Sequence, residues 1–564
     1  MARDKFRRWV GEYQSVPGAR VSLTDQESAD VLAAWLGSSA RSPTWPSTIR
    51  SSYRVETGET FAEDLPRAGE EVPPRAGCCS SARGLYWNGQ QAEEETAAPL
   101  GYLVPSRRPP HRRNHMHTWT RRRLLTSAAA TAGLAVTAAA PATAAGMSST
   151  RLGGDILTAL RALPGLRVIE ERQGAEAGYR FFVLGLRQPA DHTDPAAGTF
   201  EQRLTLLHTS VDRPTVLFST GYEASLTPRR AEPTVLLGGN QLQVEHRFFG
   251  TSRPANADHS LLTIRQAADD HHRVVRLFRR LYRGAWISTG SSKGGMTSVY
   301  HRRFHPGDVD GTVAYSAPNN VDDRDDTAYA RFLERVGSAE CREALRTVQQ
   351  QALLRRSDLV ARYESWAAAN YTSFRVVGSA DKALEIAVLR APFMFWQRNT
   401  AADGAAIPGS NCSADELYTW LDDITGLALY ADTALQRYIP YFYQLGTQLG
   451  YVSFPTRHLS RLLRYPDAGE PRTLVPRDIP MRFDRDAMPD IDRWVHRHGS
   501  RLLFVNGAQD PSVAESFRPG VRGSRLLWAP DANHSTAIAE LSPADRAEAI
   551  GMLTLWAGGT SPSA

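Results

Sequence analysis

The chain has 564 residues, of which 42% are hydrophobic and 22% charged, a balance typical of a globular protein that can bury a large core. Residues 1–144 hold 18 of the 66 Lys and Arg and 14 of the 60 Asp and Glu, which leaves 48 basic against 46 acidic residues in the body. This nearly neutral body argues against a nucleic-acid partner, and the composition excludes a fibre or a repeat array.

Residues 116–144 have the composition of an export signal. Arg121, Arg122 and Arg123 precede an Ala-rich run that ends near Ala140, and an Ala-x-Ala cleavage site follows. The run is too short and too weakly apolar for a membrane span, which needs about 20 strongly apolar residues. A buried Ala-rich helix is the alternative. We predict a twin-arginine export signal, with the export machinery as a partner, no stable membrane anchor and a secreted, extracellular product.

Residues 1–115 precede this signal and are rich in Pro, Gly, Ser, Arg and Glu, with little periodicity. Such a composition does not bury a core. We predict a disordered or misassigned extension, with Met116 as the natural start and a mature chain that begins near Ala145. The mature chain keeps Cys341 and Cys412, a pair that is able to form a disulfide in an exported protein, although the sequence does not show whether they are close.

Between residues 145 and 320, apolar runs with strand character alternate with helical periodicity. The predicted strands are Leu166 to Ile169, Tyr179 to Leu186, Phe200 to Leu207, Pro214 to Ser219, Gln241 to Phe249, Trp286 to Thr289 and Gly311 to Ser316. The predicted helices are Ile156 to Leu163, Ser260 to Leu281 and Met296 to Phe304. This alternation indicates a mostly parallel sheet with helices on both faces.

Residues 321–495 have a different pattern, in which amphipathic helices and aromatic residues dominate. The predicted helices are Tyr329 to Arg335, Cys341 to Arg355, Ala383 to Ala391, Ala414 to Leu421 and Ala431 to Leu449, the last with a break or kink at Pro440. Strand patterns return at residues 501–507 and 524–528, and a helix is predicted over 542–556. Residues 321–495 are therefore predicted to form a helical cap inserted into the sheet rather than a second domain, and residues 496–564 to complete the sheet.

The motif Gly290-Ser291-Ser292-Lys293-Gly294 lies between a predicted strand and a predicted helix. This is the context of the nucleophile elbow of an α/β-hydrolase, in which the serine stands on a strained turn and the glycines leave room for it. The fold class predicted for the chain is therefore α/β, an α/β-hydrolase with a large cap after the elbow half.

A serine nucleophile needs a base, and the base needs an orienting carboxylate. In α/β-hydrolases the carboxylate and the histidine follow the serine in that order, each after a strand. Asp510 follows the strand at 501–505, and His534 follows the strand at 525–528. We predict Ser292 as the nucleophile, His534 as the general base and then acid, and Asp510 as its orienting group.

Other candidates for these roles are Ser291, Asp531, His301, His305, His496 and His498. The serine is not at the apex of the motif, and the aspartate would have to fold back sharply toward a histidine three residues later. The first two histidines lie on the helix after the motif, and the last two precede a strand. All six are expected to lie outside the catalytic group.

Acyl transfer also needs two backbone donors for the oxyanion. The N–H groups of Lys293 and, in the loop after an early strand, Tyr222 are predicted to supply them. No spacing typical of a metal site or a cofactor motif is present, so no metal and no cofactor are predicted.

Several separated blocks resemble those of lysosomal-type Pro-Xaa carboxypeptidases and dipeptidyl peptidases. The blocks are residues 188–192, 199–203, 244–254, 290–296 and 316–318. With residues 239–245 and 507–517 added, the chain from about 150 to 560 more closely resembles the secreted tripeptidyl and prolyl tri/tetrapeptidyl aminopeptidases of actinomycetes. That resemblance implies a secreted serine exopeptidase that releases short peptides from free N termini near proline. Ser512 stands where an aromatic residue commonly follows Asp-Pro in that family.

An aminopeptidase must hold the ammonium group of its substrate, and a buried carboxylate is the usual means. Glu245, in an apolar strand-like run, is the first candidate and Glu223 the second. The alternative for Glu245 is an internal ion pair with Arg247 or another arginine.

These observations predict an exported peptidase that acts on peptides by a Ser-His-Asp acyl-enzyme mechanism. An esterase or lipase is the first alternative, because the catalytic group is shared. A non-catalytic hydrolase-like binding protein is the second, but it would be expected to lack one of the three catalytic residues.

Overall fold

The computed structural model describes residues 155–173, 176–255 and 258–559, together with the backbone of three strands nearer the N terminus. The chain divides into two units, Met1–Glu94 and Glu95–Ala564. In the first unit, β1 (Arg20–Asp25), β2 (Val31–Leu36) and β3 (Ser51–Glu56) pair antiparallel in the order β2-β1-β3.

These three strands lie in the stretch for which the sequence analysis predicts disorder or misassignment. Val21-Ser22-Leu23 and Tyr53-Arg54-Val55 each alternate apolar and polar residues, which is the period of a strand, although the polar composition of the whole stretch hides it. The rest of residues 1–115 and the predicted export signal lie outside the described residues, so the predicted start of the chain stays a prediction.

The second unit is built on a nine-stranded sheet in the order β12-β11-β10-β9-β7-β8-β6-β5-β4. The strands are β4 (Leu166–Arg172), β5 (Arg180–Pro189), β6 (Thr199–His208), β7 (Thr215–Ser219), β8 (Asn240–Val244), β9 (Trp286–Ser291), β10 (Gly311–Tyr315), β11 (Leu502–Gly507) and β12 (Arg525–Ala529). The six strands from β12 to β8 run parallel, and β6, β5 and β4 continue the sheet antiparallel. The carboxyl ends of β9, β11 and β12 therefore meet at one edge of the sheet.

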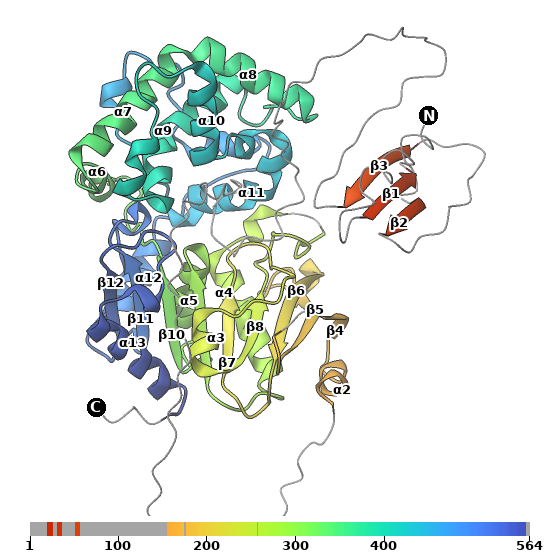
Figure 1. Ribbon diagram of the computed structural model, residues 1–564. Helices are drawn as coiled ribbons and strands as arrows, with labels where there is room; N and C mark the ends of the chain where they lie inside the picture. The colour runs from red at the N-terminus through yellow and green to blue at the C-terminus, as the bar shows by residue number, and fades with distance from the viewer. Residues whose placement is uncertain are drawn as a thin grey trace, which may run out of the picture. The chain divides into compact units, whose positions relative to one another are not determined.

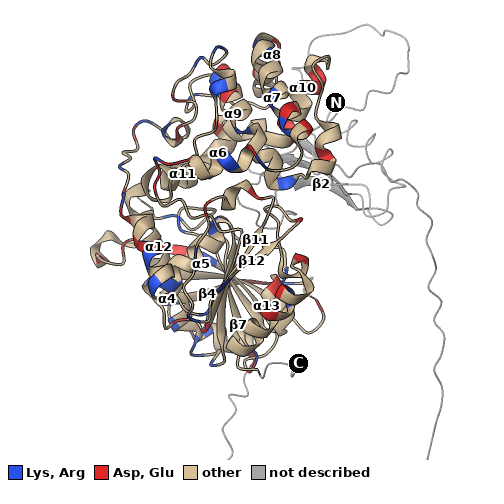
Figure 2. Ribbon diagram, turned by 90° about the vertical axis from the view of Figure 1, so that its left-hand side faces the viewer, with Lys and Arg blue, Asp and Glu red and all other residues tan. Residues whose placement is uncertain are grey.

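Helices cover both faces of this sheet, as Figure 2 shows in a view along its edge. The helices of this layer are α2 (Ile156–Arg161), α3 (Glu232–Leu237), α4 (Ile264–Phe278), α5 (Lys293–Phe304), α12 (Ala487–Arg497) and α13 (Pro543–Trp556). Neighbouring residues of β10 show the division: Ala314 packs with α5 and α12, whereas Val313 packs with α13 on the opposite face. The predicted α/β-hydrolase fold is thus confirmed.

The cap lies between β10 and α12, beyond the carboxyl ends of the parallel strands (Figure 1). Its helices are α6 (Thr327–Leu333), α7 (Ala339–Leu354), α8 (Arg356–Ala369), α9 (Ala380–Arg398), α10 (Ala414–Thr425) and α11 (Asp432–Gln444). Nearly all of α9 is buried, which makes it the central helix of the cap core.

The sequence predicts a break or kink at Pro440, and the structure shows no break there, because α11 continues through this residue. Pro440 lies inside α11, and the helix widens to a π turn over Leu445–Leu449. Cys341 is buried and Cys412 half-buried, and both thiols are free.

Among the described residues, no helix combines the length and the apolar character that a membrane span requires.

Candidate active site

Ser292 stands at the apex of the turn between β9 and α5, with φ 50° and ψ −120°. A positive φ is strained for a residue with a side chain and is typical of a functional turn. The turn depends on two glycines. A Cβ on Gly290 would lie 2.4 Å from the carbonyl carbon of Gly294, and a Cβ on Gly294 would lie 2.2 Å from the carbonyl oxygen of Ser219. The predicted strand, turn and helix are all present.

Asp510 and His534 are brought together from the ends of β11 and β12. Nδ1 of His534 lies 2.7 Å from Oδ2 of Asp510, which is fully buried, and Oδ1 of Asp510 accepts a hydrogen bond from the Ser512 N–H at 2.9 Å. Nε2 of His534 is buried and has no hydrogen-bond partner within the described ranges. This is the nitrogen that a serine nucleophile needs as its base.

The competing histidines lie elsewhere. Nε2 of His301 lies 2.8 Å from Asp308, and Nε2 of His305 lies 2.6 Å from Asp269. The exposed candidates are His496, His498 and Asp531. In the part of the chain that the structure describes, none of the competitors forms a hydrogen bond or ion pair with the side chain of His534 or Asp510.

The loop after β7 packs directly against the elbow. A Cβ on Gly221, where φ is 74°, would lie 2.6 Å from the backbone nitrogen of Gly294. The Tyr222 N–H donates to Oγ1 of Thr220 at 3.2 Å, so its predicted contact with an oxyanion requires this weak bond to open. The oxyanion roles of Tyr222 and Lys293 stay predictions.

The side chain of Lys293 has a place that the sequence does not indicate. Its Nζ is buried, donates to the carbonyl oxygen of Gly221 at 2.7 Å, and lies over the rings of Tyr222 and Phe249 at 5.4 and 4.9 Å. Burial holds the pKa of this amine well below its usual value. Lys293 therefore fixes the loop after β7 against the helix that carries Ser292.

Ser292 opens onto a cavity of about 80 Å³ between the sheet and the cap. The walls are mainly aromatic and aliphatic. The cavity is lined by Ser292, Met296, Pro318, Asn320, Tyr329, Arg390, Phe393, Gln397, Tyr441, Leu445, Leu449, Gly450, Tyr451, Val452, Phe454 and Ser512. Within the described ranges, the buried amide of Asn320 has neither a donor nor an acceptor partner, and Oε1 of Gln397 is also unpartnered. The cavity thus offers apolar walls with a few unused polar groups, which is typical of a ligand site.

Gln397, on the cap helix α9, contacts both the loop that follows Asp510 and the loop that carries His534. Its backbone carbonyl oxygen accepts a hydrogen bond from the backbone N–H of His534 at 3.1 Å, and its side-chain Nε2 donates to Oγ of Ser512 at 2.6 Å. Ser512, which stands where an aromatic residue commonly follows Asp-Pro in the family, therefore accepts a hydrogen bond from a cap side chain. Sequence analysis missed Gln397 because nothing in the pattern of an amphipathic helix distinguishes it.

Glu245 is fully buried and does not line the cavity. One carboxylate oxygen accepts from the Ala224 N–H at 2.9 Å, and the other accepts from Ser252 Oγ at 2.7 Å and from the N–H groups of Thr251 and Ser252. The geometry favours a structural role in the turn at 248–252 over the predicted ammonium site. Of the internal partners predicted for Glu245, Arg247 binds Asp270 at 2.7 Å instead. Burial raises the pKa of Glu245, and the charge of another arginine, Arg203, acts on it with the smaller and opposite effect of lowering that pKa.

Glu223 pairs with Arg437 of α11 through both carboxylate oxygens. The ion pair links the loop after β7 to the cap and occupies the carboxylate that was the second candidate for the substrate ammonium. The structure does not bring Glu223 and Glu245 together at Ser292.

Three other carboxylates lie on the same chain segments as lining residues of the cavity, without lining it themselves. We call them the acidic rim: Asp323, Asp326 and Glu515. Oδ1 of Asp323 accepts from the N–H of Tyr451 at 2.7 Å, Asp326 accepts from Ser453, and Oε2 of Glu515 accepts from the N–H of Val321 at 3.4 Å. In the described part of the chain, none of the three is paired with a cationic side chain.

Burial raises the pKa of all three rim carboxyls, and burial together with neighbouring aspartates raises the pKa of Glu515 to about 7. A cation placed among them would lower these pKa values and relieve the repulsion between the carboxylates. Sequence analysis missed the rim because its members come from two segments about 190 residues apart.

The model of the PS-10 peptidase S37 family matches residues 151–564. A prolyl tri/tetrapeptidyl aminopeptidase of Streptomyces mobaraensis is 48% identical over 424 residues, which cover 74% of this chain and 88% of the relative. A prolyl carboxypeptidase-like protein 5 of Caenorhabditis elegans is 32% identical over 121 residues, which cover 18% of this chain and 24% of the relative. Among solved structures, a proline iminopeptidase of Mycobacterium smegmatis is 14% identical with a TM-score of 0.32, over 69% of this chain and 99% of that one.

Proposed function

The chain belongs to the PS-10 peptidase S37 family and is a serine peptidase, and from this premise we propose that it releases tri- or tetrapeptides from free N termini near proline. The relative from Streptomyces mobaraensis bears the name of that activity and supports the proposal. The observation that carries it is the acidic rim beside the cavity of Ser292, because an aminopeptidase needs an anionic group for the substrate ammonium.

In the proposed mechanism, Oγ of Ser292 attacks the carbonyl carbon of the scissile bond and gives its proton to Nε2 of His534. Asp510 holds the imidazolium in place through the 2.7 Å contact at Nδ1. His534 then passes the proton to the departing amine, and the acyl group stays on Ser292. Deacylation repeats these steps with water as the nucleophile and releases the N-terminal peptide.

Different parts of the site are proposed to bind different parts of the substrate. Its aromatic and aliphatic walls suit an apolar ring such as that of proline, and the unpartnered amide of Asn320 is able to bond a substrate peptide group. The acidic rim would bind the substrate ammonium group. In the described part of the chain the rim carboxylates have no cationic side-chain partner, and the ammonium would supply that positive charge.

Substitution of Glu515 tests this proposal. We expect Glu515→Gln to raise KM about tenfold for tripeptide p-nitroanilides with a free amine and to change kcat little, because one charge contact of about 1.4 kcal/mol is lost. In the native enzyme, KM for these substrates should fall as pH rises through about 7, since Glu515 becomes ionised and then attracts the ammonium. Glu515→Gln should remove that pH dependence.

Control measurements distinguish a failure of the proposed ammonium site from a failure of the proposed peptidase activity. Glu343→Gln removes an exposed carboxylate that pairs with Arg346 on α7, and it should leave KM unchanged. If Glu515→Gln has no effect on KM, the rim does not hold the ammonium. If free-amine peptides are not cleaved while short acyl esters are hydrolysed, the enzyme is the esterase of the first alternative.

We further propose that the peptidase is exported, on the composition of residues 116–144. N-terminal sequencing of the product recovered outside the cell should give a start near Ala145. Peptides from residues 1–115 in that product would contradict both the export signal and the start at Met116.

A further inference from the structure

A second group of ligating side chains lies far from Ser292. His272 comes from α4, His305 caps the C-terminal end of α5, and Asp308 lies in the turn that leads to β10. The twelve residues of α5 lie between Ser292 and His305, which corresponds to a separation of roughly 20 Å at about 1.5 Å per residue. The group is therefore distinct from the catalytic site.

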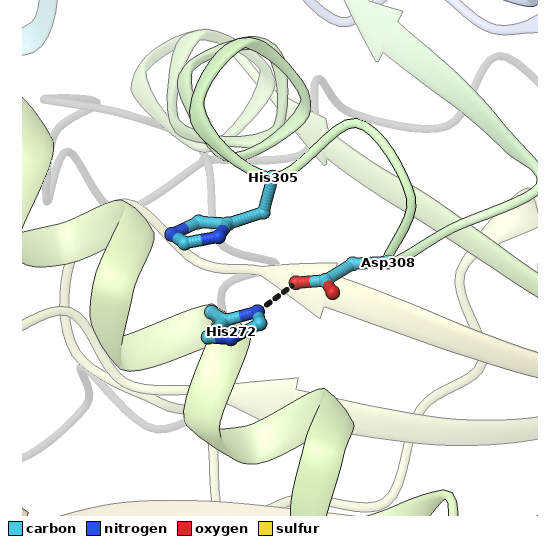
Figure 3. Close-up of side chains that lie close together, drawn as sticks. All are labelled: His272, His305 and Asp308. Atoms are coloured by element: carbon cyan, nitrogen blue, oxygen red, sulfur yellow. Dashed lines mark hydrogen bonds and ion pairs between the residues drawn. The ribbon is translucent and has the colours of Figure 1, made fainter.

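The three side chains lie close together, with the ring of His305 above that of His272 and Asp308 beside both (Figure 3). One ligand atom of each lies within 4.8 Å of the others, and Nδ1 of His272 lies 2.8 Å from Oδ2 of Asp308. The rings of His272 and His305 are stacked, with centroids 4.0 Å apart and planes 10° apart. Two imidazoles this close repel each other when both are protonated, whereas a shared metal ion uses their neutral forms.

The surrounding residues hold these ligands in the way that metal sites require. Nε2 of His305 lies 2.6 Å from Oδ1 of Asp269, which leaves Nδ1 for a metal, and Arg265 holds Asp269 in turn at 3.0 Å. A carboxylate on the second nitrogen of a ligating histidine is the usual arrangement at zinc sites, where it fixes the tautomer and the ring orientation.

Asp308 is held in place by a side chain outside the proposed ligand group. Nε2 of His301 lies 2.8 Å from Oδ2 of Asp308, and the Asp308 side chain is only 12% exposed.

We propose that His272, His305 and Asp308 bind a divalent transition-metal ion of the zinc class, with water in the fourth position. Two imidazole nitrogens and one carboxylate oxygen suit zinc and its neighbours, while calcium and magnesium prefer six or more oxygen ligands. The ion would join α4 to the end of the helix that carries Ser292, so its role is structural.

Metal binding requires a small rearrangement. Bonds of about 2.0 to 2.2 Å in tetrahedral geometry put ligand atoms about 3.3 Å apart. The contact of 2.8 Å between His272 and Asp308 must widen, and the stacked rings must turn so that their lone pairs converge. The 29% and 16% exposure of the two histidine side chains leaves room for this movement.

The test is zinc uptake by tag-free protein after treatment with a chelator. Equilibrium dialysis should show one tight zinc equivalent in the native protein that is lost in His272→Ala. Cobalt in place of zinc should give the visible absorption of a tetrahedral ion. Zinc should raise the Tm of the native protein by several degrees and should leave kcat for peptide hydrolysis unchanged.

His498→Ala is the matched control, because it removes an exposed histidine on another element and should keep the zinc equivalent. His305→Ala gives a second variant if His272→Ala fails to fold. Equal zinc uptake by the native protein and both ligand variants would overturn the proposal, and so would the absence of stoichiometric binding. A loss of activity on zinc removal without a change in Tm would overturn its structural role.

Discussion

At the scale of single residues, the catalytic group depends on a contact from the cap. The side chain of Gln397 donates to the Ser512 hydroxyl, and the Ser512 N–H donates to Asp510. A cap side chain is therefore linked through Ser512, by two hydrogen bonds, to the carboxylate proposed to orient His534. A displacement of that carboxylate by a fraction of an ångström would misalign the base.

We therefore expect Gln397→Met to lower kcat about tenfold with little change in KM, because the change removes the hydrogen bond and keeps the side-chain volume. The backbone bond from His534 to the carbonyl of residue 397 is retained. Steady-state kinetics and a thermal scan measure the effect. A rise in KM with unchanged kcat would show that Gln397 binds substrate, and a fall in Tm of many degrees would show a merely structural role.

The sequence alone predicts site residues whose proposed roles follow from chain order. Ser292, Asp510 and His534 each follow a strand, and parallel strands bring such residues to one edge. It does not identify residues whose roles depend on folding across the cap. Glu245 resembles a buried binding carboxylate in sequence, but a turn uses its hydrogen bonds, while the acidic rim and Gln397 carry no local signal.

The proposed metal ligands also carry no local signal in the sequence. The sequence predicts no metal site because it offers no spacing typical of one, whereas the proposed ligands are supplied by two helices and a turn.

At the scale of elements, the strands of the sheet and its helices α2, α4, α5 and α13 are close to their predicted ranges, because period and flanking turn residues define them. Two other helices of the sheet layer, α3 and α12, are not predicted from the sequence. In the cap, α8 is not predicted either, and α9 extends to Ala380–Arg398, well beyond the predicted range, because a helix buried on all sides shows no amphipathic pattern.

The C-terminal end of α10 contains a half-buried carboxyl whose ionisation opposes folding. Oδ1 of Asp422 accepts from the Leu427 N–H at 2.9 Å, and burial raises the pKa of this group to about 6. The protonated form is favoured in the folded state, so this contribution to stability is present at low pH and is lost as pH rises through about 6.

We expect Asp422→Asn to raise the free energy of unfolding at pH 8, by on the order of 2 kcal/mol at most, since the amide keeps the acceptor without the charge. The difference from the native protein should vanish near pH 4. Glu364→Gln, an exposed change on α8, is the control and should show no such pH dependence. A lower Tm for Asp422→Asn at pH 8 would contradict the assignment.

At the scale of the whole molecule, the sheet supplies the proposed catalytic residues, and the cap lies beyond the ends of its parallel strands (Figure 1). Side chains of both line the cavity at Ser292. The cap is joined to loops at this site by Gln397, which bonds Ser512 and the backbone of His534, and by Arg437, which pairs with Glu223. The fold class and the existence of a cap could be predicted, because strand patterns stop at residue 320 and return near 501. The shape of the cavity could not, because it depends on how side chains from separate cap segments pack.

The central claim is that Ser292 is the nucleophile of this peptidase. The most direct measurement is peptide mass mapping after labelling with a fluorophosphonate, performed on the native enzyme, Ser292→Ala and Ser291→Ala. We predict one label on the peptide that contains residues 291 and 292, its complete loss together with peptide hydrolysis in Ser292→Ala, and its retention in Ser291→Ala. Labelling of Ser292→Ala at the same peptide, or no labelling of an active native enzyme, would contradict the account.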